Sequence, residues 1–157
     1  MLDKLYFGLI NLLTRGHYAA RPARLELTPL EERLMLEVVK ALPQTAGTML
    51  EHQIANFNLI QRDGNSQKSV FYRLERGTEQ YPEELLFPRR EPNLVFANVS
   101  FRVAGVRDPF HAAFWAHNGR LFQIAFDRSV REVSGNSEVE IVGVRVSPEK
   151  LVGSGDV

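Results

Sequence analysis

The fold is decided by the stretch His111-Ala-Ala-Phe-Trp-Ala-His117-Asn118-Gly119-Arg120-Leu-Phe-Gln-Ile-Ala-Phe126. It consists of two β-patterned runs separated by Asn-Gly. Both turn residues tolerate the positive φ that a type I′ turn requires. The stretch therefore predicts a β-hairpin with a two-residue turn.

A two-residue turn also predicts which side chains share a face of this hairpin. It pairs His117 with Arg120 at the tip, which we expect to be solvated, and it pairs Trp115 with Phe122 further along. The more apolar face then carries Trp115, Phe122, Ile124 and Phe126. We predict that this face packs on helices.

The first half of the chain has the periodicity of helices. Thr28 and Glu31 form a Thr-x-x-Glu capping box with Pro29 in the first turn, so a helix is predicted from residue 29 up to Pro43. Its apolar positions recur at helical spacing: Leu30, Leu34, Met35, Val38, Val39, Ala41 and Leu42. Leu34 and Val38 are expected to meet the apolar face of the hairpin. A further helix is expected over 45–57.

Beyond residue 57 the apolar period changes from 3.6 to 2. Strands are expected at 57–62, 69–75, 94–103, 110–117, 120–126 and 139–146. Helices followed by consecutive strands are typical of an α+β domain. We predict one such domain over 1–152, with an antiparallel sheet of about six strands and two or three helices packed on one face. Residues 153–157 are expected to be a flexible tail.

Residues 1–16 have the pattern of an amphipathic helix that ends at Gly16. Its apolar run is interrupted by Gly8 and Asn11 and is too short to span a bilayer. We therefore predict no membrane span. The helix is expected to dock on its own domain or on a second copy of the chain.

Composition narrows the possible functions. Lys+Arg and Asp+Glu both number 19, so the chain lacks the net positive charge typical of a nucleic-acid binder, and we predict no nucleic-acid partner. The absence of cysteine excludes thiol chemistry and fits a cytoplasmic location.

His111 and His117 would lie about 20 Å apart along one strand, too far to share a metal ion. We predict no metal, no cofactor and no catalytic residue.

The connection 77–92 has an unusual composition for a loop, with three prolines and the apolar run Leu85-Leu86-Phe87. Either this run packs across the sheet as a lid, or the segment presents a contact patch to a partner. Phe110 and Phe114 fall on the hairpin face opposite the predicted core, which a loop or a partner must cover. The predicted partner-binding residues are Tyr81, Phe87, Arg89, Arg90, Phe110 and Phe114.

Over 114–126 the chain resembles a loose group of uncharacterised bacterial α+β proteins. These carry a final hairpin of this pattern after a helix with Leu and Gln, like residues 50–54 here. The resemblance spans 45–126 and transfers no catalytic residue. Some of those proteins are thought to be immunity-like or partner-binding, which implies a non-enzymatic domain that binds a protein or a second copy of itself. The alternative is a small-molecule-binding or hydrolytic domain that uses the concave face of the sheet.

Overall fold

The computed structural model describes residues 18–20 and 27–153. The helix expected over 1–16 and the tail from residue 154 lie outside them. The helices are α2 (Pro29–Ala41), α3 (Gln44–Asn56), α4 (Glu149–Val152) and the 3-10 turn η1 (Glu83–Leu85). The strands are β1 (Tyr18–Ala20), β2 (Leu59–Asp63), β3 (Lys68–Tyr72), β4 (Leu74–Glu75), β5 (Thr78–Glu79), β6 (Leu94–Val103), β7 (Phe110–His117), β8 (Arg120–Phe126) and β9 (Val139–Val146).

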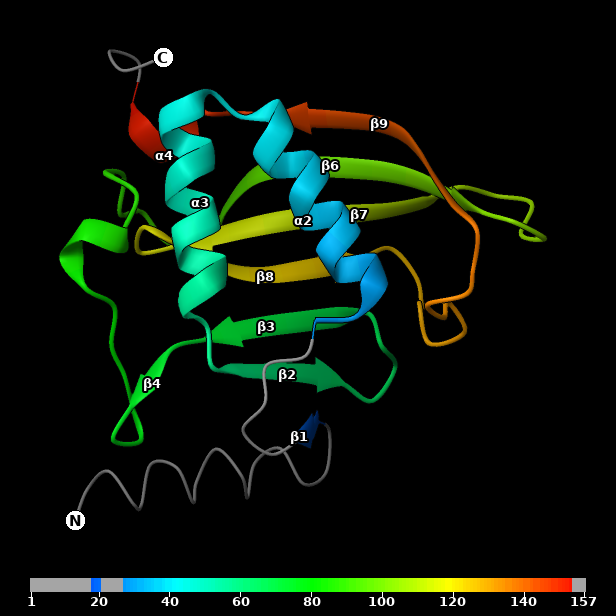
Figure 1. The fold of residues 1–157 in the computed structure, drawn as a ribbon, viewed down its shortest axis with the longest axis horizontal. Helices are drawn as coiled ribbons and strands as arrows, with labels where there is room; N and C mark the ends of the chain where they lie inside the picture. The colour runs from blue at the N-terminus through cyan, green and yellow to red at the C-terminus, as the bar shows by residue number, and fades with distance from the viewer. Residues whose placement is uncertain (1–17, 21–26, 154–157) are drawn as a thin grey trace.

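The predicted α+β architecture is confirmed. The main sheet has the strand order β1-β2-β3-β8-β7-β6-β9, and every described pair of neighbours is antiparallel. Six of its strands have five or more residues, and β1 has three. Figure 1 shows α2 and α3 side by side across one face of this sheet. β4 and β5 form a separate small hairpin.

The capping box predicted for α2 is present and also anchors the helix to the sheet. Glu31 N–H donates to Thr28 Oγ1 over 3.1 Å, and Thr28 N–H donates to Glu31 Oε2 over 2.8 Å. The Glu31 carboxylate accepts further hydrogen bonds from Arg62 Nε on β2 and Ser69 Oγ on β3. Because Glu31 is buried, these charge-assisted bonds compensate for its lost hydration. Glu31 thus caps the N-terminus of α2 and also fixes the position of the helix over β2 and β3.

The core lies between the two helices and the sheet. Phe114 is fully buried and contacts the edge of Phe96, with ring centroids 6.2 Å apart. Phe101 and Phe110 stack in the same layer at 5.2 Å. The other fully buried apolar side chains include Leu34, Val38, Leu50, Phe71, Val99, Leu121 and Ile124.

The register predicted for the hairpin is correct at the turn and wrong beyond it. Asn118 and Gly119 both have positive φ, and His117 pairs with Arg120. The register then shifts by one residue, so that Trp115 pairs with Gln123 rather than with Phe122. An extra residue in one strand of an antiparallel pair is a β-bulge, and it exchanges the faces of all residues beyond it.

This bulge inverts part of the face prediction. Phe110 and Phe114 lie under the helices, whereas Trp115 and Phe122 are only half-buried, Trp115 on the opposite face. The expectation that Trp115 and Phe122 face the helices is therefore wrong. Ile124 keeps its predicted place in the core because the shift brings it opposite Phe114.

Candidate interaction surface

Three of the aromatic residues predicted to contact a partner are buried within the domain. Phe87 and Phe114 have no exposed surface, and Phe110 is 5% exposed. Phe87 packs against Phe96 at 6.0 Å, which anchors the 77–92 connection to the core. The guanidinium of Arg128 lies 3.9 Å above the ring of Phe110. These aromatic residues therefore do not form a common outer surface, and their contact with a partner stays a prediction.

The two arginines of that connection are held by acidic residues of the same segment. Arg89 Nε donates to the carboxylate of Glu91 over 3.1 and 3.2 Å, and Arg90 Nη2 donates to Glu83 Oε1 over 2.6 Å. The hydrogen bond from Arg89 lowers the pKa of Glu91. Arg89 also donates to the carbonyl oxygen of Glu149, which ties the connection to α4. Both cations are thus neutralised within the domain.

Tyr81, the fourth predicted aromatic residue, belongs to what we call the Arg120 cluster: Glu79, Tyr81, His117, Arg120 and Phe122. Arg120 Nη2 lies 2.5 Å from Glu79 Oε1, and its guanidinium stacks over the rings of Tyr81 and Phe122 at 5.1 and 5.2 Å. Arg120 is 7% exposed, so the expectation of a solvated hairpin tip is wrong. The β4–β5 hairpin supplies the acid that covers it.

Burial dominates the electrostatics of this cluster. Desolvation raises the pKa of Glu79 more than the Arg120 ion pair lowers it. Desolvation also raises the pKa of Tyr81 well above its usual range. Among the residues that the structure describes, no hydrogen-bond partner is found for the buried atoms Tyr81 Oη, His117 Nδ1 and the nearby Trp115 Nε1. Unpaired buried polar atoms are costly, so these atoms mark a place where a polar ligand atom would be stabilised.

Sequence reasoning missed Gln53, a fully buried amide on α3. Its Nε2 donates to the carbonyl oxygens of Leu85 and Gly119 over 2.7 and 3.1 Å, and its Oε1 accepts from Leu121 N–H over 2.7 Å. The side chain therefore joins the helix, the 77–92 connection and the hairpin turn. The available signal was its spacing: Gln53 follows Leu50 by three residues and so lies on the inward face of the helix.

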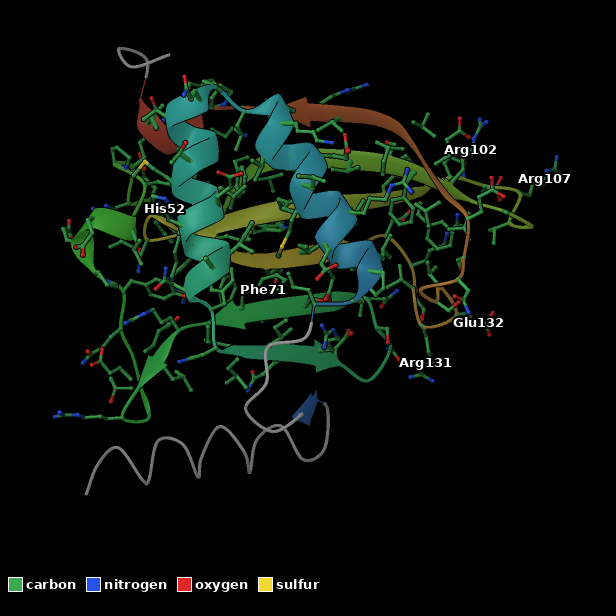
Figure 2. All side chains as sticks on the ribbon, viewed as in Figure 1. His52, Phe71, Arg102, Arg107, Arg131 and Glu132 are labelled. Carbon is green, nitrogen blue, oxygen red and sulfur yellow. The ribbon has the colours of Figure 1, made fainter. Side chains whose placement is uncertain are left out.

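Among the surface hollows, two lie beside α2. The smaller, about 360 Å³, lies at the start of α2, where the oxygens of Glu31 are already occupied by Thr28, Arg62 and Ser69. The larger, about 810 Å³, lies between α2 and the first half of β9, with charged residues around it. Its lining includes Arg102, which Figure 2 shows at the rim of the molecule near Arg107.

Within residues 18–20 and 27–153, no His, Cys, Asp or Glu cluster could hold a metal ion.

The edge strands of the described sheet are β1 and β9, and each is paired with one neighbour, β1 with β2 and β9 with β6 (Figure 1). β1 has three residues, whereas β9 has eight, so β9 presents the longer open edge. Val142 in the middle of β9 is 52% exposed. Glu140 and Arg145 are exposed as well, and neither makes an ion pair or side-chain hydrogen bond within the described part of the chain.

No family model, curated protein or solved structure matches this chain. No helix within the described residues combines the length and apolarity needed to cross a membrane.

Proposed function

We propose that this protein is a non-enzymatic protein-binding domain that contacts its partner through the outer edge of β9. The observation that carries the proposal is the difference between the two edge strands of the described sheet: β1 has three residues, whereas β9 has eight and presents a much longer open edge. An edge strand presents unpaired backbone N–H and C=O groups to any extended segment that approaches it. Such an edge can bind a protein partner by strand addition.

The composition of β9 supports this proposal. Natural edge strands that avoid pairing are usually short or carry lysine or proline. β9 has eight residues with the sequence Val-Glu-Ile-Val-Gly-Val-Arg-Val, and it contains neither lysine nor proline. Its protective features are a bulge, where the register with β6 shifts between Ser100 and Phe101, and one charged residue on each side of that bulge, Glu140 and Arg145. The rest of the strand is suited to pairing.

The test uses one substitution at the edge and one matched control. Val142→Lys places a charge on the exposed middle of β9, and Leu36→Lys introduces the same charge at an exposed apolar residue of α2. A partner is first captured from the source cells with the wild-type protein, purified and titrated against each variant. We expect Val142→Lys to weaken binding by about tenfold or more, since edge lysines oppose strand pairing. Leu36→Lys should bind as wild type does.

Hydrogen exchange then locates the contact. The bound partner should slow amide exchange in residues 139–146. Unchanged affinity of Val142→Lys, or protection confined to residues 81–92, would contradict an interface at β9. Protection at 81–92 would instead support the contact predicted from Tyr81, Phe87, Arg89 and Arg90.

A second candidate function is small-molecule binding at the Arg120 cluster. It is favoured by the buried polar atoms of Tyr81, His117 and Trp115 that have no hydrogen-bond partner within the described part of the chain. Trp115 is the single tryptophan of the chain, so its fluorescence reports on this place directly. We would titrate a library of small carboxylates and amides. A saturable emission change that His117→Ala removes supports this candidate, and an unchanged spectrum across the library contradicts it.

A further inference from the structure

We infer that the partner at the β9 edge is a second copy of this chain, which joins the two sheets into one across a twofold axis. The inference rests on the proposed use of β9 and names its occupant. It is carried by the sequence of β9, whose two halves are complementary to each other when the strand is paired with itself in antiparallel fashion.

The register between β6 and β9 shows which β9 side chains share a face. Val139 pairs with Val103, Ile141 with Phe101, Val144 with Val99 and Val146 with Ala97. These four partners on β6 are buried under the helices. Glu140 pairs with Arg102, Gly143 with Ser100 and Arg145 with Asn98 on the other face. The helix side of β9 is therefore aliphatic at every position, and the other side carries one acid and one base.

If the twofold axis passes between Val142 and Gly143, the side chains of the two copies are complementary on both faces of the joined sheet. This axis places Glu140 opposite Arg145 of the second copy, and the symmetry repeats this pair at the other end of the strand. On the helix side, it places Ile141 opposite Val144 of the second copy. Opposite charges and aliphatic pairs directly across two strands stabilise an antiparallel pair.

The neighbouring registers do not have this property. A shift by one residue in either direction places Glu140 opposite Val144 or Val146, so a charged side chain and an aliphatic one would share a face. The bulge at Val142 lies on the axis of the matching register, so the regular segments on both sides of it remain available for pairing. Of these three registers, only the one with its axis between Val142 and Gly143 matches both faces.

The charges near the edge also suit a second copy. Glu140 and Arg145 are exposed and unpaired within the described part of the chain, so neither must leave an ion pair in order to form the new one. The formal net charge of the chain is zero, so two copies do not repel each other strongly. The larger hollow runs beside Val139 and Ile141, where it leaves room for the aliphatic side chains of the incoming strand.

Sedimentation equilibrium on charge-reversal variants of the full chain tests this inference. The wild-type protein should reach a mass of twice 17.9 kDa. Glu140→Arg and Arg145→Glu should each weaken dimerisation by about tenfold or more, because each reversal replaces both symmetric attractions by repulsions. The combined variant E140R/R145E should regain most of the wild-type affinity, since the charges are then exchanged. Glu132→Arg and Arg76→Glu are matched reversals at exposed sites away from β9 and should change nothing.

Three results would overturn the inference: a monomeric wild type at the highest attainable concentration, a combined variant no better than the single ones, or a dimer that all β9 variants retain. Failure of the inference is distinguishable from failure of the proposed function. If the wild type is monomeric and a different protein still protects residues 139–146 from exchange, only the identity of the partner is wrong. If no protein protects them, the proposed function is wrong as well.

Discussion

The Gln53 side-chain amide on α3 donates a hydrogen bond to the carbonyl oxygen of Gly119, in the turn of the β7–β8 hairpin, 66 residues away along the chain. The same amide accepts the N–H of Leu121, the second residue of β8. The hairpin turn is therefore held by a helix side chain as well as by its own local conformation. A chain that forms α3 and the hairpin separately gains these bonds only when the two dock.

Replacement of Gln53 should be strongly destabilising. Gln53→Leu keeps the volume but leaves Leu85 C=O and Leu121 N–H without partners, at about 1–3 kcal/mol each, while Gly119 C=O keeps its hydrogen bond from Phe87 N–H. We expect a loss of about 3 kcal/mol or more in the free energy of unfolding, measured by urea denaturation. Gln44→Leu is the control, since Gln44 is exposed on the same helix. Equal stability of the two variants would show that the amide hydrogen bonds are not formed.

Gly119 should tolerate alanine much less well than Gly105. Both residues have positive φ, near +81° and +83°, so both substitutions carry a backbone cost of about 1 kcal/mol. At Gly105 an added Cβ would meet nothing, whereas at Gly119 it would lie 2.7 Å from the carbonyl oxygen of Phe87. We expect Gly119→Ala to cost at least about 2 kcal/mol more than Gly105→Ala in thermal unfolding. Equal costs would mean that Phe87 does not approach the turn.

The inverted hairpin face has a direct consequence for mutations of its aromatic residues. Phe114→Ala removes a fully buried ring and should cost about 3–5 kcal/mol. Phe122 is half-buried and contacts Arg120 and His117, so Phe122→Ala should cost about 1–2 kcal/mol. Chemical denaturation of both variants measures the order. A larger loss at Phe122 would restore the face assignment made from the turn alone.

The raised pKa of Glu79 predicts how its contribution to stability depends on pH. The folded state holds the Glu79 proton more tightly than the unfolded chain does, so the unfolded state binds fewer protons and stability falls as pH rises. The unfolding free energy of wild type minus that of Glu79→Gln should therefore decrease as the pH rises above about 4.3, the ordinary pKa of glutamate. The decrease should stop once the pH exceeds the raised pKa of Glu79 in the folded state. Urea denaturation across this range measures it. A difference that grows with pH would mean that Arg120 outweighs burial.

The sequence was sufficient for the elements that are defined by local chemistry. Thr28 and Glu31 form the predicted capping box, because that motif satisfies its hydrogen bonds within one turn of chain. Asn118 and Gly119 form the predicted turn for the same reason. The order of helices and strands then led to the correct fold class.

The register of the hairpin and the buried polar contacts were not predictable in this way. No glycine or other local signal marks the bulge beside Phe122, which depends on how β8 packs between β3 and β7. The burial of Arg120 depends on Glu79 and Tyr81, which reach it from a different hairpin. The open edge at β9 follows from the strand order, and the spacing of the strands along the chain does not specify that order.

Hydrogen exchange of the β9 amides at increasing protein concentration tests the central claim most directly. If the outer edge of β9 is the contact surface and a second copy occupies it, exchange in residues 139–146 should slow as concentration rises through the dimerisation range. In Glu140→Arg the same amides should stay fast until much higher concentration, while amides of the core strands β7 and β8 exchange as in wild type. Exchange in 139–146 that is independent of concentration and identical in Glu140→Arg would contradict this account.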